Sequence, residues 1–129
     1  EKEMLAKMHL TDPERVMVSY PFELSGGMKQ RVGIAMSMTA RPRLLLADEP
    51  TSALDVTIQA EVVREMKKLR EQYETAIILV THNMGVASYI SDKIGVMCKG
   101  ELVEFGKTER LFSTPSDKRT EDYITGRFG

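Results

Sequence analysis

The sequence predicts an α/β fold with a mostly parallel sheet flanked by helices, and three observations support this. Apolar runs without polar alternation occur at 44–47 and 76–81, as in strands that are covered on both faces. Helical periodicity fills the segments around them, so strands and helices alternate along the chain. Polar side chains follow both runs directly, at the strand ends where ligands bind in parallel sheets.

The composition is that of an ordinary globular domain. The 129 residues are 42% hydrophobic and 29% charged, with 18 basic and 19 acidic side chains. A net charge of -1 gives no electrostatic reason to expect nucleic acid or an anionic membrane surface as a partner. Cys98 is the single cysteine, which excludes an internal disulfide. No apolar run approaches the ~18 residues of a spanning helix, and the charged start at 1–3 predicts no signal peptide.

Two short helices are expected before residue 24. The first covers 1–9 and has three apolar side chains at helical spacing, Met4, Leu5 and Met8. Asp12 followed by Pro13 is a helix-start signal for the second. Its inward side chains are expected to be Val16, Met17 and Tyr20. Pro21 predicts where it ends.

Ser25, Gly26 and Gly27 stand where a third helix is expected to begin. Ser25 is a capping residue, and the two glycines leave backbone N–H groups uncovered. A helix N-terminus carries about half a positive charge and several unbonded donors, so this segment can bind phosphate. An ordinary capped helix is the alternative interpretation of these three residues taken alone. The helix is expected over 28–39, with an inward face formed by Met28, Val32, Ala35, Met36 and Thr39.

Two acids follow the first predicted strand. A carboxylate at the end of a buried strand is desolvated unless a cation or hydrogen-bond donors meet it. Asp48 is therefore a candidate ligand of Mg²⁺, which takes oxygen ligands and retains several waters. Glu49 is a candidate general base that polarises an attacking water. For an Asp-Glu pair in general, the alternative interpretation is that both acids are solvated and have no role in catalysis or metal binding.

Another helix and strand follow in the same order. Asp55 is expected to cap a helix over 56–73 with an apolar stripe formed by Val62, Met66, Leu69 and Tyr73. The strand over 76–81 leads into His82, which can donate to a phosphate and orient a water. A structural histidine is the alternative.

The remaining chain predicts a hairpin and short helices. A helix is expected to end near residue 90, followed by strands at 93–98 and 101–105 that are joined by a tight turn. Glu101 and Glu104 are expected on a solvated face, and Leu111 on a short helix. The polar segment 113–122 is expected to be mobile. Three later side chains are expected to dock back onto the domain: Tyr123, Ile124 and Phe128.

Taken in order, these motifs resemble the C-terminal half of ATP-binding cassette (ABC) transporter ATPase subunits over about residues 4–105. Four segments are similar to the family's signature motif, Walker B segment, D-loop and switch histidine: 24–30, 44–49, 52–55 and His82. The resemblance implies a partial P-loop NTPase fold, ATP and Mg²⁺ as cofactors, and ATP hydrolysis coupled to solute uptake by an importer.

The resemblance also implies partners and residue roles. Two ATPase domains of this family sit head to tail and bind transmembrane permease subunits at the cytoplasmic face of the inner membrane. Glu49 and His82 would be catalytic and Asp48 would hold Mg²⁺, all three at the chain's own ATP. The residues implied to bind nucleotide are Ser25, Gly26, Gly27, Gln30 and Asp55, the first three at the partner's ATP and the last at the dimer interface. Nucleic acid is not an implied partner.

No Gly-x-x-x-x-Gly-Lys-Ser/Thr phosphate loop occurs in the sequence, although the family has one upstream of these motifs. We therefore expect a C-terminal fragment of one ABC ATPase domain that lacks the phosphate-loop half. Residues 1–43 would belong to the helical subdomain, 44–106 to the core and 107–129 to a C-terminal tail. Alone, such a fragment is expected to be inactive, and its exposed apolar edges to favour association.

The solute is predicted from local resemblances only. Three segments look like peptide and nickel importer ATPases: 20–23, 46–49 and 54–60. Three others look like the phosphate importer ATPase: 81–84, 100–106 and 120–129. The longer match favours the peptide or nickel type, with the phosphate type next. The alternatives are a soluble ABC ATPase of DNA repair or translation, which would ordinarily bring coiled-coil or basic segments, and a non-catalytic interaction fragment.

Overall fold

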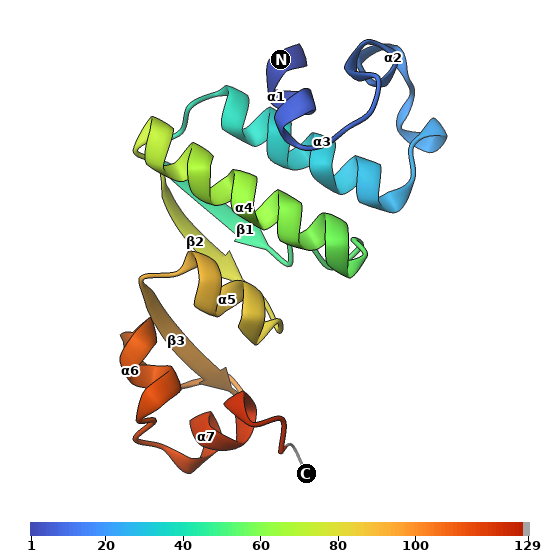
Figure 1. Cartoon of the computed structure of the whole chain (residues 1–129). Helices are drawn as coiled ribbons and strands as arrows, with labels where there is room; N and C mark the ends of the chain where they lie inside the picture. The colour runs from blue at the N-terminus through green and yellow to red at the C-terminus, as the bar shows by residue number, and fades with distance from the viewer. Residues whose placement is uncertain (128–129) are drawn as a thin grey trace. The chain divides into compact units, whose positions relative to one another are not determined.

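The computed structural model describes residues 1–127 and divides the chain into two compact units, Glu1–His82 and Asn83–Gly129 (Figure 1). Helices and strands alternate over residues 26–98, as the sequence predicts. No helix in the described part of the chain combines the length and apolar character that crossing a lipid bilayer requires. All the candidate site residues lie in the first unit.

The first unit has four helices, and all but the first begin directly after a predicted capping residue. They are α1 (Lys2–Lys7), α2 (Pro13–Val18), α3 (Gly26–Thr39) and α4 (Val56–Tyr73), with a 3-10 turn at Pro21–Glu23. The side chain of Asp12 accepts the Arg15 N–H at 3.2 Å, which caps α2. Asp55 accepts the N–H groups of Thr57 and Ile58, each at 3.1 Å, which caps α4.

The apolar faces of these helices agree with the sequence in part. The three predicted residues of α1 are buried, and so are Val62, Met66 and Leu69 of α4. In α2 only Val16 is buried, and the inward orientation predicted for Met17 and Tyr20 is wrong, since they are 50% and 66% exposed.

The predicted inward face of α3 is also wrong in part. The buried residues are Ile34, Ala35 and Met38, whereas Met36 is 68% exposed and Thr39 is exposed. The reason is that α3 packs against α1, and this contact turns the buried stripe away from the predicted position.

Strand β1 (Leu44–Asp48) pairs with β2 (Ala76–Val80) in the predicted parallel arrangement, with Leu46 opposite Ile78 and Asp48 opposite Val80. The expected burial of both faces is wrong. Burial alternates along each strand, and Leu46 and Ile78 are 70% and 56% exposed. The opposite face does pack: Leu45 and Ala47 line a small hollow together with Ile34 of α3 and Met66 of α4. A two-stranded sheet with helices on one side leaves its other side in solvent.

The second unit contains the predicted hairpin. Its elements are α5 (Met84–Ile90), β3 (Lys93–Cys98), β4 (Glu101–Lys107), α6 (Thr108–Ser113) and α7 (Lys118–Ile124). The two strands are antiparallel, and the register changes where Val96 faces Glu104 while Met97 faces Leu102. Val103 is the extra residue of a β-bulge, which bends the strand and redirects its side chains.

Glu104 lies in the interior of this unit and not on the predicted solvated face. It is 9% exposed, whereas Glu101 is exposed as expected. Its carboxylate accepts the backbone N–H groups of Ser116 at 3.0 Å and Asp117 at 3.2 Å, and the Arg110 guanidinium lies 3.0 Å away. These donors, with the Ser116 N–H first, hold the pKa of Glu104 at about 2, below its ordinary 4.5.

The C-terminal segment is ordered by the same contacts. The expectation of a mobile stretch over 113–122 is wrong, because α7 begins at Lys118 and Thr120 is fully buried. Tyr123 and Ile124 are half-buried, in agreement with the predicted docking. The predicted docking of Phe128 lies outside the described residues.

Candidate functional site

The carboxyl ends of β1 and β2 bring two of the predicted catalytic residues together. Glu49 is the first residue after β1, and its N–H donates to the Val80 carbonyl of β2 at 2.8 Å, which continues the strand pairing by one residue. Its φ of 44° is in the left-handed region, where a non-glycine residue is strained. The chain therefore turns away from the sheet at Glu49.

The Glu49 carboxylate is held by residues that follow β2. Its Oε1 accepts the backbone N–H of His82 at 2.8 Å, and its Oε2 accepts the Thr81 hydroxyl at 3.4 Å. The His82 Nε2 lies 3.5 Å from Oε1 and forms an ion pair when the imidazole is protonated. The Glu49 side chain is 30% exposed and the His82 side chain 92%, so both are open to a ligand from solvent.

Asp48 ends β1 with an exposed side chain opposite Val80. Within residues 1–127, no group of three or more histidine, cysteine, aspartate or glutamate side chains gathers in a way that would hold a metal. Mg²⁺ that is bound together with a nucleotide does not need three such side chains, because it takes one or two carboxylates and completes its coordination shell with phosphate oxygens and water. Asp48 and Glu49, adjacent at one strand end, fit that requirement.

The predicted phosphate-binding segment lies at the start of α3. The Ser25 hydroxyl oxygen accepts the Met28 N–H at 3.2 Å, so Ser25 caps the helix and is itself exposed. Gly27 packs closely on the segment after β1. A Cβ at Gly27 would lie 3.1 Å from Leu54 Cδ2 and 3.2 Å from the Ala53 carbonyl oxygen, tighter than ordinary contact. The predicted signature segment and D-loop thus lie against each other within one chain, and this contact explains why position 27 is a glycine.

Gln30 and Asp55 are bonded within the chain. The Gln30 amide nitrogen donates to the Glu49 carbonyl at 2.8 Å, and its amide oxygen accepts the Ala53 N–H at 3.1 Å. One carboxylate oxygen of Asp55 is engaged in capping α4. Both residues were expected at bound nucleotide, and that role stays a prediction.

Sequence reasoning missed the supporting residues around the turn. Thr51 is 2% exposed, and its hydroxyl accepts the Gln59 side-chain N–H at 2.9 Å. The Ser52 hydroxyl donates to the Glu49 carbonyl at 3.1 Å. Hydroxyl residues directly after a strand end are a usable signal for such a turn. Their glutamine partners come from other helices, which no local pattern reveals.

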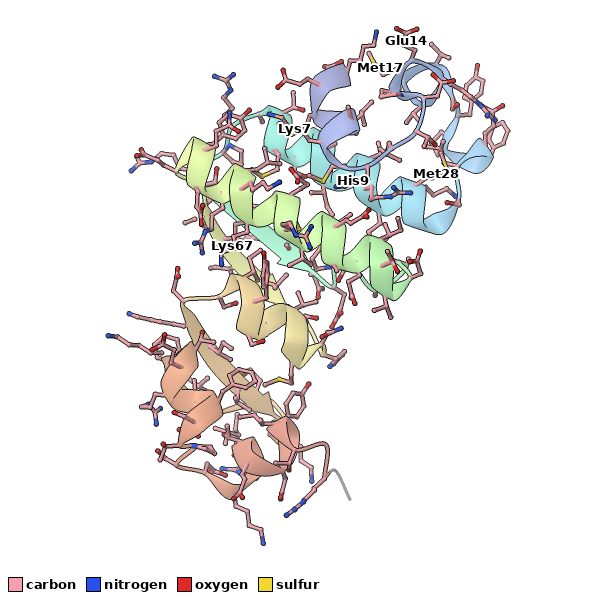
Figure 2. All side chains as sticks on the ribbon, viewed as in Figure 1. Lys7, His9, Glu14, Met17, Met28 and Lys67 are labelled. Atoms are coloured by element: carbon pink, nitrogen blue, oxygen red, sulfur yellow. The ribbon has the colours of Figure 1, made fainter. Side chains whose placement is uncertain are left out.

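Arg31 fixes the same end of α3 from the other side. Its guanidinium donates to the His9 carbonyl at 2.6 Å and to the Gly27 carbonyl at 3.3 Å. His9, labelled in Figure 2, is exposed, and its Nδ1 lies 3.6 Å from Glu61 of α4. The start of α3 is therefore bonded to the segment that follows α1 through Arg31 and to the turn after β1 through Gln30.

Comparisons with known proteins point to one family. A family model described as ABC transporter matches residues 2–52, which include Ser25, Asp48 and Glu49. The glutathione import ATP-binding protein GsiA of Salmonella choleraesuis (strain SC-B67) is 44% identical over 123 residues, 95% of this chain and 20% of that protein. The chain belongs to the ABC transporter ATP-binding family. Escherichia coli (strain K12) GsiA is also 44% identical, over 119 residues that are 92% of this chain and 19% of that protein.

Solved ABC structures confirm the P-loop NTPase type of fold. A dimeric post-hydrolysis structure of the ATP-binding cassette MJ0796, bound to ADP and Pi, superposes with a TM-score of 0.74 at 34% identity. The match covers 82% of this chain and 44% of that one. A second dimeric structure of MJ0796, described as a bacterial ABC transporter cassette, gives the same values. The chain spans about a fifth of the length of the GsiA proteins it matches.

Proposed function

We propose that this ABC chain belongs to the ATP-hydrolysing subunit of an importer, and that Glu49 is its general base. The single observation that carries the proposal is the Glu49 carboxylate held at 2.8 Å by the His82 N–H, beside Asp48, at the carboxyl edge of a parallel strand pair. Ligands of open α/β sheets bind at that edge.

Glu49 and His82 have different roles in the proposed hydrolysis of ATP. A carboxylate has about four lone-pair sites, and the bonds from His82 and Thr81 use two of those on Glu49. A remaining site accepts a proton from water as the water oxygen bonds to the γ-phosphorus, and the bond to the ADP oxygen breaks. The exposed His82 imidazole donates to a γ-phosphate oxygen.

Asp48 would hold Mg²⁺, which neutralises phosphate charge when it is bound. Through the helix N-terminus, Ser25, Gly26 and Gly27 would bind the phosphates of a second nucleotide. Asp55 would lie at the interface with a second ABC ATPase domain.

The proposed partners follow from the relatives. MJ0796 is dimeric in both structures, which supports a head-to-tail pair of ATPase domains. The GsiA proteins are glutathione import proteins at 44% identity, which supports a peptide-type solute and transmembrane permease subunits. The chain would then be peripheral at the cytoplasmic face of the inner membrane. Within it, 1–43 would belong to the signature-bearing helical subdomain, 44–106 to the core and 107–129 to the tail.

The test is Mg²⁺-dependent ATP hydrolysis by the natural full-length protein and by the 129-residue chain. Glu49→Gln keeps the size of the side chain and removes its basicity, so we expect turnover by the full-length protein to fall by about 100-fold or more. Glu71→Gln is the matched control, because its carboxylate is exposed on α4, 3.8 Å from the Arg70 guanidinium. The 129-residue chain alone is expected to show no turnover. Full-length turnover that survives Glu49→Gln would contradict the proposal.

A further inference from the structure

The side chain of Gln30 links two segments that the proposed mechanism uses separately. It lies one helical turn after Gly27, at the start of α3. Its amide nitrogen donates to the Glu49 carbonyl at 2.8 Å and lies 3.4 Å from the Ser52 hydroxyl. Its amide oxygen accepts the Ala53 N–H at 3.1 Å. One side chain therefore contacts both ends of the turn that follows β1.

The Gln30 side-chain amide bonds to the turn in the way that a backbone peptide group of a neighbouring β-strand would. A primary amide offers donors and an acceptor on one rigid plane, so it can bond a carbonyl and an N–H of the turn at the same time. The Glu49 carbonyl also accepts the Ser52 N–H at 3.2 Å and the Ser52 hydroxyl at 3.1 Å, so Gln30 adds a bond from outside the turn to those made within it. The turn needs such support, because Glu49 has a left-handed φ of 44°. A held Glu49 carbonyl also holds the backbone from which the Glu49 carboxylate reaches the His82 N–H.

We propose that Gln30 is a positioning residue that couples the signature segment at Ser25–Gly27 to the general base Glu49 of the same chain. The inference rests on the proposed function and deepens it. A phosphate bound at the start of α3 would belong to the partner's nucleotide, whereas Glu49 acts on the chain's own. Displacement of α3 by that phosphate would move the Gln30 amide and, through it, the carbonyl of Glu49.

This role differs from the nucleotide-binding role expected from the sequence. Both ends of the Gln30 amide already bond to the turn, so its loss removes support from Glu49 and no contact to ATP. Turnover should then fall while the KM for ATP stays the same. A residue that binds nucleotide would raise the KM when it is replaced.

Two variants of the natural full-length protein and one control separate these roles. Gln30→Met keeps the length of the side chain and removes the amide. Gln30→Glu keeps an acceptor for the Ala53 N–H and removes the donor to the Glu49 carbonyl. This variant also provides the test if Gln30→Met fails to fold. Gln72→Met is the matched control, because Gln72 is exposed near the end of α4 and does not belong to the turn.

The measurements are the kcat and KM of ATP hydrolysis and amide hydrogen exchange in peptides spanning 49–53 and 81–83. For Gln30→Met we expect a kcat lower by about ten-fold or more, with KM within about two-fold. Exchange should become faster at Ala53 and at His82, whose N–H is bonded to Glu49. Gln30→Glu should keep Ala53 protected and lower kcat at least as much as Gln30→Met, because it removes the donor to the Glu49 carbonyl and places a carboxylate beside it. Gln72→Met should leave kcat within about two-fold.

Two results would overturn the coupling. One is a raised KM with unchanged kcat, which would make Gln30 a nucleotide ligand. The other is unchanged exchange at both peptides, which would show that the turn is held without Gln30. If the full-length protein shows no Glu49-dependent hydrolysis, the proposed function is wrong, and the exchange measurement still decides whether Gln30 supports the turn.

Discussion

Two glutamates, one in each unit, show how the surroundings of a carboxylate decide its use. Glu104 is 9% exposed and is met by two backbone N–H groups and the Arg110 guanidinium. Glu49 is 30% exposed and is met by the His82 backbone N–H, by the Thr81 hydroxyl at 3.4 Å and by the exposed His82 imidazole at 3.5 Å. Glu104 is surrounded by donors and fastens the C-terminal segment. Glu49 is fixed in direction but keeps an open side, which is what a general base needs.

After Glu49→Gln, the largest effect on turnover is expected from loss of the His82 imidazole, which lies 3.5 Å from the Glu49 carboxylate. His82→Ala keeps the backbone N–H that bonds to Glu49 and removes an imidazole whose side chain is 92% exposed. We expect the kcat of the full-length protein to fall by about 10- to 100-fold, with an unchanged Tm. Steady-state ATPase assays and thermal unfolding measure this. Unchanged turnover would show that the imidazole takes no part in the reaction.

The second prediction concerns the role of Glu104 as an anchor. Glu104→Gln replaces one acceptor oxygen with an NH₂ that faces the Ser116 N–H in either orientation, together with the Arg110 guanidinium in one and the Asp117 N–H in the other. We expect Tm to fall by at least about 4 °C and the Ser116 and Asp117 amides to exchange faster. Glu101→Gln on the same strand is the control, since Glu101 is exposed. Equal Tm values for the two variants would contradict the anchoring role.

Acid should loosen the same anchor. The pKa of Glu104 is lowered from 4.5 to about 2, with the Ser116 N–H as the first cause. A group whose pKa is lower in the folded state contributes stability above its unfolded pKa and loses it as the pH falls. Protection of the Ser116 amide should therefore decline as the pH falls from about 4.5 toward 2. A Glu104→Gln chain should lack this part of the pH dependence. A decline that is the same in both chains would assign the effect to other acids.

The smallest effect is expected at the weak second contact to Glu49. Thr81→Val keeps the shape of the side chain and removes the hydroxyl that lies 3.4 Å from Glu49 Oε2. We expect kcat to fall by about two- to five-fold with no change in KM. Thr57→Val on α4 serves as the control for a threonine outside the site. A loss as large as that for His82→Ala would mean that Thr81 positions the carboxylate more than the His82 N–H does.

The sequence predicts those features that depend on nearby residues. Asp12, Ser25 and Asp55 cap their helices as expected, because each capping residue lies within three positions of the N–H it accepts. The hairpin follows from the turn at Lys99 and Gly100. The ends of β1 and β2 meet because parallel strands align their carboxyl ends.

The features that the sequence did not predict depend on distant residues. Gln30 reaches a partner 19 positions away at Glu49, and Glu104 meets Ser116 12 positions on. A bulge in β4 precedes Glu104, and strand alternation does not reveal it. The open face of Leu46 and Ile78 depends on which elements pack on the sheet, and periodicity within a strand does not contain that information.

The most direct test compares the two glutamates in one experiment on the natural full-length protein. ATP hydrolysis and Tm are measured for Glu49→Gln and Glu104→Gln. We predict that Glu49→Gln abolishes turnover with little change in Tm, and that Glu104→Gln lowers Tm while the protein still turns over ATP below its transition. Turnover retained by Glu49→Gln, or lost equally in both variants at a temperature where both are folded, would contradict the account.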